Sequence, residues 1–293
     1  MTEVARLSTR LAPSRSEDFY RDILTRLNAA RAPYLVGGAY AFACLTGISR
    51  QTTKDLDLFV RGDDCGRILR LLRAAGYRTE VPFPHWLAKV YAGDAFIDII
   101  FSTGNGQLPV DNEWFTYALP GQVLGVPVRL APIEEMLCTK AFVMERERYD
   151  GADVIHFVRA AAESLDWPRL LRRFGNHWPV LLSHLILFGY VYPDERWRLP
   201  RGLVESLCQR VEAPVVPGDD VPVGVCRGGL LSRSQYVMAF DDWGYDDARC
   251  LPHGNMTAEE LRVWTEAAPR PLPRCTHDAA DAPLAAGSRG SST

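Results

Sequence analysis

This sequence of 293 residues contains few lysines, no positive net charge and no long apolar run. Only Lys54, Lys89 and Lys140 are lysines among 33 basic residues, and the formal net charge is −3, so no overall basic field indicates a nucleic-acid partner. No apolar run reaches about 18 residues, the length that a membrane-spanning helix needs. The seven cysteines include no Cys-x-x-Cys pair, which favours reduced thiols over a disulfide framework. We therefore expect a cytoplasmic protein with no membrane partner.

Two carboxylates interrupt an apolar stretch. Asp55 and Asp57 alternate with leucines, so both acids would project from one face of a β-strand. Two like charges this close resist burial unless a cation lies between them. Asp98 interrupts a second strand-like run at residues 96–101, although pairing with an arginine is the alternative interpretation of this acid. Hard oxygen ligands of this kind suit Mg²⁺, so we predict that the three aspartates bind metal.

A glycine pair precedes the first two of these acids. Gly37-Gly38 follows an apolar run at residues 34–36 and would turn the chain from a strand into a helix. Glycines at such a turn let the backbone approach a triphosphate, whose charge the amides at a helix N-terminus can meet. A tight turn without a ligand is the alternative. In the following link, Arg50 and Lys54 are candidate phosphate contacts, or else ordinary solvated charges.

This pattern resembles the DNA polymerase β-like nucleotidyltransferase superfamily. It is most similar to stand-alone bacterial members with a Gly-Gly turn, including the AbiEii/MenT-like toxins. The resemblance covers roughly residues 30–160, and it implies an α/β (α+β) fold with a mixed sheet flanked by helices. The residues that carry the resemblance are Gly37, Gly38, Arg50, Thr52 or Thr53, Asp55, Asp57 and Asp98.

A second signature lies on the helix predicted to start near residue 132. In AbiEii-like enzymes such a helix carries a lysine that contacts nucleotide phosphate, followed by acids that bind substrate or act as a base. Lys140, Asp150 and Asp153 match this arrangement. Without the resemblance, Lys140 could be a snorkelling lysine at a helix edge. Asp150 could mark a helix break, and Asp153 could be an N-cap.

The remaining segments predict the domain organisation. We expect a flexible lead at residues 1–16, the nucleotidyltransferase domain at 17–160, a mainly helical C-terminal domain at 161–266 and a disordered tail at 267–293. Residues 102–121 read as a loop. The segment 225–247 is dense in glycine, arginine, aromatics and acids, so it either packs as a subdomain or folds back over the active site. A helix with Arg169, Arg172 and Arg173 could face RNA or solvent.

The resemblance implies a two-metal reaction. Asp55 and Asp57 would hold both Mg²⁺ ions, Asp98 would complete the ion that activates a hydroxyl, and Gly37, Gly38 and Lys140 would hold the NTP. We expect transfer of a nucleoside monophosphate to a tRNA 3′ end or a protein hydroxyl, with an antitoxin as a candidate partner. The alternatives are an antibiotic or other small-molecule acceptor, and a regulatory module that binds nucleotide without transferring it.

Overall fold

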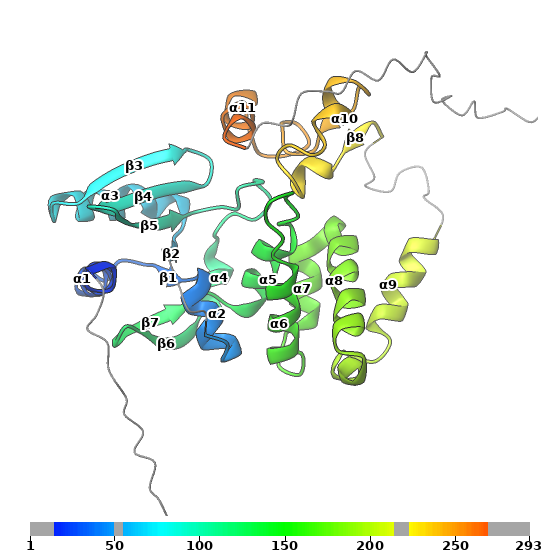
Figure 1. Ribbon diagram of the computed structural model, residues 1–293, viewed down its shortest axis with the longest axis horizontal. Coiled ribbons are helices and arrows are strands. Elements are labelled where there is room, and N and C mark those ends of the chain that lie inside the picture. The colour runs from blue at the N-terminus through cyan, green and yellow to red at the C-terminus, as the bar shows by residue number, and fades with distance from the viewer. Residues whose placement is uncertain (1–14, 50–54, 214–222, 269–293) are drawn as a thin grey trace, which may run out of the picture.

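The computed structural model describes residues 15–49, 55–213 and 223–268 (Figure 1). The predicted lead at 1–16 and tail at 267–293 therefore lie almost wholly outside the described residues. Arg50 and Lys54, the two candidate phosphate contacts in the link, lie outside them as well.

Within the described residues, seven strands form one sheet in the order β3-β4-β5-β2-β1-β7-β6. The pairs β2–β5 and β1–β7 are parallel, and the other neighbours are antiparallel. This mixed sheet with flanking helices confirms the predicted fold class and is consistent with a polymerase β-like nucleotidyltransferase fold. The strands are β1 (Leu35–Val36), β2 (Leu56–Phe59), β3 (Arg78–Phe83), β4 (Leu87–Ala92), β5 (Ala95–Ile100), β6 (Leu119–Val123) and β7 (Val126–Leu130).

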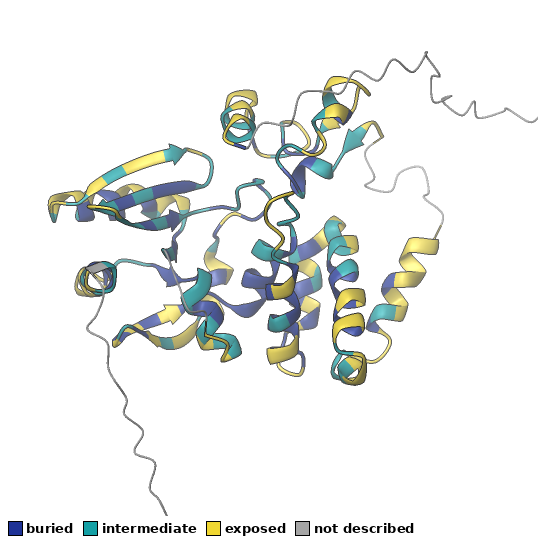
Figure 2. Cartoon of the chain, in the orientation of Figure 1, coloured by how far each residue is buried: buried dark blue, intermediate teal, exposed yellow. Residues whose placement is uncertain are grey.

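Helices precede, connect and follow these strands. In α3 the side chains of Ile68, Leu69 and Leu72 are buried, because leucines and isoleucine recur on one helical face while arginines occupy the other. Helix α5 is buried along most of its length between the sheet and the later helices (Figure 2). The helices of this part are α1 (Arg15–Ala29), α2 (Gly38–Thr46), α3 (Gly62–Ala74), α4 (Asn112–Thr116), α5 (Ile133–Ala141) and α6 (Gly151–Ala161).

We predicted a loop at residues 102–121, and this prediction was wrong for its second half, which contains α4 and the start of β6. Asp111 caps α4 by accepting a hydrogen bond from the Glu113 amide at 2.8 Å, and Trp114 is fully buried. Strand β6 then pairs with β7 at the edge of the sheet. An edge strand tolerates Pro120 because one side of its backbone needs no ladder partner, so the proline and glycine that suggested a loop do not prevent a strand here.

Of the three α-helices that follow residue 161, the first two pack onto α5 and α6 and the third packs onto the second, and buried residues of all three join the same hydrophobic cluster as the sheet. The predicted boundary at residue 160 falls at the end of α6, and the division into two domains stays a prediction. These helices are α7 (Trp167–Phe174), α8 (Trp178–Val191) and α9 (Leu203–Glu212), with short 3₁₀ helices at Gly175–His177 and Pro193–Arg198.

The arginines of α7 do not share one environment. Arg169 is buried, with only 2% of its surface exposed, and pairs with the carboxylates of Glu134 and Glu135 on α5. Arg173 pairs with Asp111 at 2.6 Å and with Glu135. Both alternatives, an RNA-facing and a solvent-facing role, were therefore wrong for Arg169 and Arg173, whose ion pairs hold α7 against α5 and the start of α4.

Residues 223–268 form a separate segment above the sheet (Figure 1). Its α11 begins with a capping box between Thr257 and Glu260 and lies against β3. No helix of the described residues is long and apolar enough to cross a membrane. The elements of this segment are β8 (Val225–Cys226), β9 (Asp246–Asp247), α10 (Val237–Asp241), α11 (Ala258–Glu266) and a 3₁₀ helix at Gly228–Leu230.

Candidate active site

The predicted glycine turn lies directly over the strand that carries Asp57. Gly37 separates β1 from α2, and its amide donates to the Asp57 carbonyl at 2.9 Å. Gly38 has a φ of +54°, a left-handed conformation that favours glycine. Its Cα faces the Asp57 side chain so closely that no Cβ would fit. The turn therefore brings the N-terminus of α2 against the carboxylate.

The three predicted metal ligands meet at one point. Asp55 immediately precedes β2, Asp57 lies within it, and Asp98 lies on the parallel neighbour β5, where it is in register with Asp57. Each carboxylate offers an oxygen that lies within 4.8 Å of those of the other two. Spacing along one strand and register between two strands thus produce a cluster of three acids.

This cluster raises the pKa of Asp57, the acid that lies within β2. Burial, together with the negative charges of Asp55 and Asp98, raises the pKa of Asp57 to about 7, against the opposing effect of Lys140 and Arg148. Burial also raises the pKa of Asp98 above its ordinary value. Without a cation, Asp57 therefore holds a proton at pH values below about 7.

Lys89 is a neighbour of the site that we did not assign from the sequence. Its ammonium lies 2.6 Å from Oδ1 of Asp98 and packs over the Phe96 ring at 4.1 Å. The expected alternative for Asp98, a structural ion pair, is thus present, with lysine in place of arginine. This ion pair does not exclude Asp98 from the cluster, because a carboxylate oxygen of Asp98 still lies within 4.8 Å of oxygens of Asp55 and Asp57. The scarcity of lysine was the signal that could have identified Lys89.

Lys140, Asp150 and Asp153 form a second cluster, as their match to the AbiEii-like signature suggests. The Lys140 ammonium lies 2.8 Å from Asp150 and 2.7 Å from Asp153. Asp153 is not an N-cap, because it lies in the first turn of α6 and is buried. Arg148 also contacts Asp150, through Nε at 2.9 Å and Nη2 at 2.7 Å. Burial opposes ionisation of Asp150, but these cations hold its pKa below the ordinary value.

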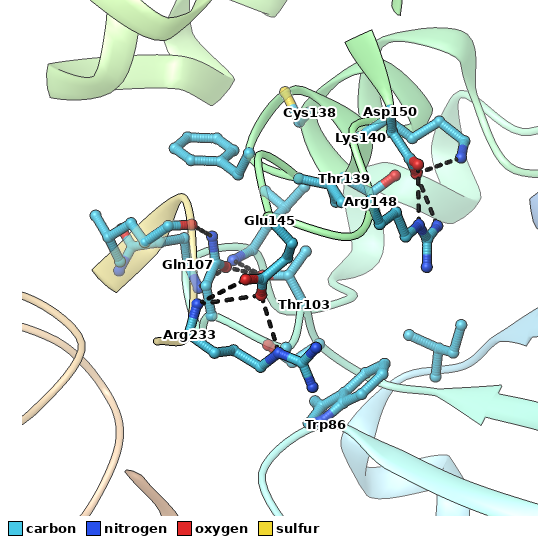
Figure 3. Close-up of a pocket in the computed structure, with 18 of the residues that line it drawn as sticks. Trp86, Thr103, Gln107, Cys138, Thr139, Lys140, Glu145, Arg148, Asp150 and Arg233 are labelled. Carbon is cyan, nitrogen blue, oxygen red and sulfur yellow. Dashed lines mark hydrogen bonds and ion pairs between the residues drawn. The ribbon is translucent and has the colours of Figure 1, made fainter. Parts of the chain in front are cut away.

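The three strand acids line one cavity of about 710 Å³ together with Lys140 and Asp150 of the second cluster, and Figure 3 labels the last two. Its walls come from the glycine turn, the strand acids, the turn between α5 and α6, and two parts of the C-terminal segment. Residues 229–233 and Trp264 are those two parts, so the segment does fold back over the candidate site. Trp86, Glu145 and Arg233 also line the cavity and were not assigned from the sequence, because only the tertiary fold brings them together.

The residues present fit a divalent cation. Three carboxylates converge at one point, and Gly38 leaves room for the Asp57 carboxylate. Oxygen donors in this number would leave further positions for water and phosphate oxygens, as Mg²⁺ prefers.

Comparison with known proteins agrees with this geometry. The family model for aminoglycoside-2''-adenylyltransferase matches residues 20–101, a range that contains the glycine turn and all three aspartates. A search of curated proteins finds no match. Among solved structures, the chain is similar to the lincosamide antibiotic adenylyltransferase LnuA bound to lincomycin, with 16% identity over 50% of this chain and 98% of that chain and a TM-score of 0.37.

Two further structures show comparable similarity. ANT(2")-Ia in complex with adenylyl-2"-tobramycin has 19% identity over 55% of this chain and 95% of that chain, with a TM-score of 0.37. An antigenic nucleotidyltransferase-like protein from Paracoccidioides brasiliensis has 15% identity over 59% and 93%, with a TM-score of 0.35. Because these TM-scores are low, the substrates of those proteins are not assigned to this chain.

The family-model match places residues 20–101 in the nucleotidyltransferase superfamily, and it supports an enzyme that transfers nucleotidyl groups. The matched family is of the aminoglycoside adenylyltransferase kind. Neither the AbiEii/MenT-like subtype nor an antitoxin partner receives support from these comparisons.

Proposed function

We propose that this protein transfers a nucleoside monophosphate from an NTP to an acceptor hydroxyl. The acceptor oxygen bonds to the α-phosphorus while the bond from that phosphorus to the bridging oxygen breaks. Pyrophosphate leaves with the electron pair, and the hydroxyl proton passes to a carboxylate or to water. The observation that carries the proposal is the convergence of Asp55, Asp57 and Asp98 beneath the Gly37-Gly38 turn.

The protein's own residues would mainly position and neutralise charge. Mg²⁺, held by Asp55, Asp57 and Asp98, would acidify the attacking hydroxyl and neutralise phosphate charge when bound. The amides at the start of α2 are placed to meet triphosphate oxygens. Lys140 and Asp150 line the same cavity, and Asp153 lies behind them in contact with Lys140; all three are candidates for nucleotide binding or proton transfer.

For the acceptor, we propose a small molecule that carries a hydroxyl. The match to an aminoglycoside adenylyltransferase family supports this class and makes ATP the first NTP to test. A cavity of about 710 Å³ is within the usual size range of small-ligand sites. A tRNA 3′ end or a protein hydroxyl, as in a toxin-like enzyme, is the second candidate, and it rests on the Lys140, Asp150 and Asp153 arrangement.

One experiment separates these acceptors and the non-enzymatic alternative. Purified protein, Mg²⁺ and each α-labelled NTP are incubated with aminoglycosides, lincosamides, total tRNA or a protein lysate. Label on an antibiotic supports the small-molecule proposal, whereas label on tRNA or protein replaces it with the second candidate. Nucleotide binding without pyrophosphate release from any mixture would favour a regulatory module and contradict transfer.

A further inference from the structure

The turn between α5 and α6 connects the nucleotide end of the cavity with the C-terminal segment. A bridge between Met144 and Tyr149 closes this turn. Arg148, near one end, contacts Asp150. Glu145, near the tip, contacts the C-terminal segment. Whatever holds the tip in place therefore also affects where Arg148 lies.

Among the described basic residues that line this cavity, Arg148 is the most exposed. Its side chain is 64% exposed, whereas that of Lys140 is 12% exposed and paired with two carboxylates. The Asp150 carboxylate accepts two hydrogen bonds from the Arg148 guanidinium, and this bidentate contact fixes the orientation of the guanidinium. The third nitrogen, Nη1, points away from Asp150 (Figure 3) and donates to no residue that the structure describes. This leaves one edge of a planar phosphate-binding group available.

The position of Arg148 relative to the acids suits a phosphate ligand. Arg148 and the strand acids line the same cavity, and the charges of Asp57 and Asp55 help to raise the Arg148 pKa, after the larger effect of its hydrogen bonds to Asp150. A metal ion neutralises only part of the negative charge of a polyphosphate, and a cation beside the predicted metal site would pair with the negative charge that remains.

The C-terminal segment holds the tip of this turn. Ser232 donates to Glu145 at 2.6 Å, and Arg233 donates to the same carboxylate through its amide and through Nε at 2.9 Å. The Met144 amide donates to the Leu231 carbonyl at 3.1 Å. These contacts hold the carboxylate of Glu145 ionised, because hydrogen bonds from Ser232 and Arg233 outweigh burial and lower its pKa.

Trp264 fastens the segment to the rest of the cavity rim. Its ring centroid lies 4.9 Å from that of Phe83 and 5.2 Å from that of Trp86. The Arg233 guanidinium packs over the same indole at 4.8 Å. A Cβ at Gly104 would lie 2.7 Å from this ring, so the backbone there is in direct contact with it. The segment is therefore docked both at Glu145 and at the aromatic rim.

We propose that Arg148 binds the phosphates of the nucleotide and of the leaving pyrophosphate, and that Arg233 positions it by docking the C-terminal segment on the 142–150 turn. This inference rests on the proposed function for its ligand. It makes Arg233 a positioning residue, because it acts through the turn. It also assigns a role to a segment of the chain that lies outside residues 20–101, the range matched by the family model.

The test measures the affinity of the full-length protein for Mg²⁺-pyrophosphate and for Mg²⁺-ATP by titration calorimetry. Arg148→Gln should weaken pyrophosphate binding at least tenfold, and Arg148→Lys should recover part of that loss. Arg146→Gln is the matched control, since Arg146 is an exposed arginine on the same turn that does not line the cavity; it should stay within twofold of the wild type. Equal affinities for the Arg148→Gln and Arg146→Gln variants would overturn the assignment. Loss for ATP alone would restrict the contact to the nucleotide and overturn the pyrophosphate part.

A double-variant cycle tests the positioning role. Arg233→Gln alone should weaken pyrophosphate binding about threefold or more, while Arg262→Gln, on α11 of the same segment, should change nothing. In the Arg148→Gln background, Arg233→Gln should add no further loss, because its effect passes through Arg148. Additive losses would overturn the positioning role. If the wild type binds Mg²⁺-pyrophosphate through Arg148 but releases none from any NTP, the transfer proposal fails and the phosphate site stands.

Discussion

A Cβ atom at position 38 would lie 1.7 Å from Oδ2 of Asp57. Such a separation is far below van der Waals contact, so any side chain at position 38 must displace the carboxylate. The left-handed φ of Gly38 adds a second reason for glycine. The glycine turn and the aspartate cluster are therefore one geometric unit, whichever acceptor the enzyme uses.

Gly38→Ala should lower nucleotidyl transfer by about 100-fold, the usual cost of displacing a reacting group by about 1 Å. Gly47→Ala is the matched control, because Gly47 also has a positive φ, +73°, but has no atom within 4 Å of a Cβ. This control should lose about 1 kcal/mol of stability and keep its activity. Steady-state rates and thermal unfolding of both variants provide the comparison. Equal activities would show that Asp57 does not depend on the space left by Gly38.

Mg²⁺ should raise the unfolding temperature more at pH 8 than at pH 5.5. With its pKa raised to about 7, Asp57 without metal holds a proton in the folded state that the unfolded state releases near pH 4. Its contribution to the free energy of unfolding therefore falls as pH rises from about 4 to 7, by about 1.4 kcal/mol per unit. Mg²⁺ binds the ionised carboxylate, so the stabilisation that Mg²⁺ provides grows over the same pH range. Calorimetric scans of wild type and Asp57→Asn measure the rise in unfolding temperature that Mg²⁺ causes at each pH. A rise that does not depend on pH in the wild type would contradict the prediction.

Lys89→Gln should move the acid limb of the pH–activity profile to higher pH. The Lys89 ammonium opposes the effect of burial on Asp98, so its removal raises the Asp98 pKa further. The check is kcat/KM measured from pH 5 to 9. Arg78→Gln, which changes an exposed cation on β3, should leave the limb where it is. An unshifted limb in Lys89→Gln would show that Asp98 ionisation does not limit the reaction.

Arg169→Met should destabilise the fold by about 3–5 kcal/mol, because it leaves Glu134 and Glu135 as buried carboxylates with a lost partner. Arg172→Met, on the exposed face of the same helix, should change stability by less than about 0.5 kcal/mol. Urea unfolding of the two variants gives both numbers. Similar values would mean that the buried pair is not needed to dock α7.

The fold class was predicted from the resemblance to polymerase β-like nucleotidyltransferases, whereas the strands that carry the three aspartates followed from local sequence patterns. Apolar alternation around Asp55 and Asp57 and a lone acid at Asp98 predicted two strands with acids on one face, and the parallel register of β2 and β5 brings those acids together. The glycine pair predicted the strand-to-helix turn in the same way. Each of these inferences uses residues within a few positions of one another, where backbone geometry restricts the outcome.

The rest of the site depends on contacts between distant segments. Arg233 meets Glu145 across 88 residues of sequence, and no periodicity marks such a pair. Lys89 opposite Asp98 required the β4–β5 register, and β6 was hidden by a proline and a glycine that only an edge position accommodates. These features follow from tertiary packing, which a single sequence does not specify locally.

The most direct test of transfer compares pyrophosphate release from ATP by wild type, Asp57→Asn and Asp94→Asn, each with Mg²⁺ and the acceptor panel. Asp94 is an exposed aspartate at the β4–β5 turn that does not line the cavity, so its variant controls for the loss of an acid from the same hairpin as Asp98. We predict Mg²⁺-dependent release by wild type and Asp94→Asn, and none above background by Asp57→Asn while its fold is retained. Release that survives in Asp57→Asn, or that is absent from the wild type with every NTP and acceptor, would contradict a metal-dependent nucleotidyltransferase.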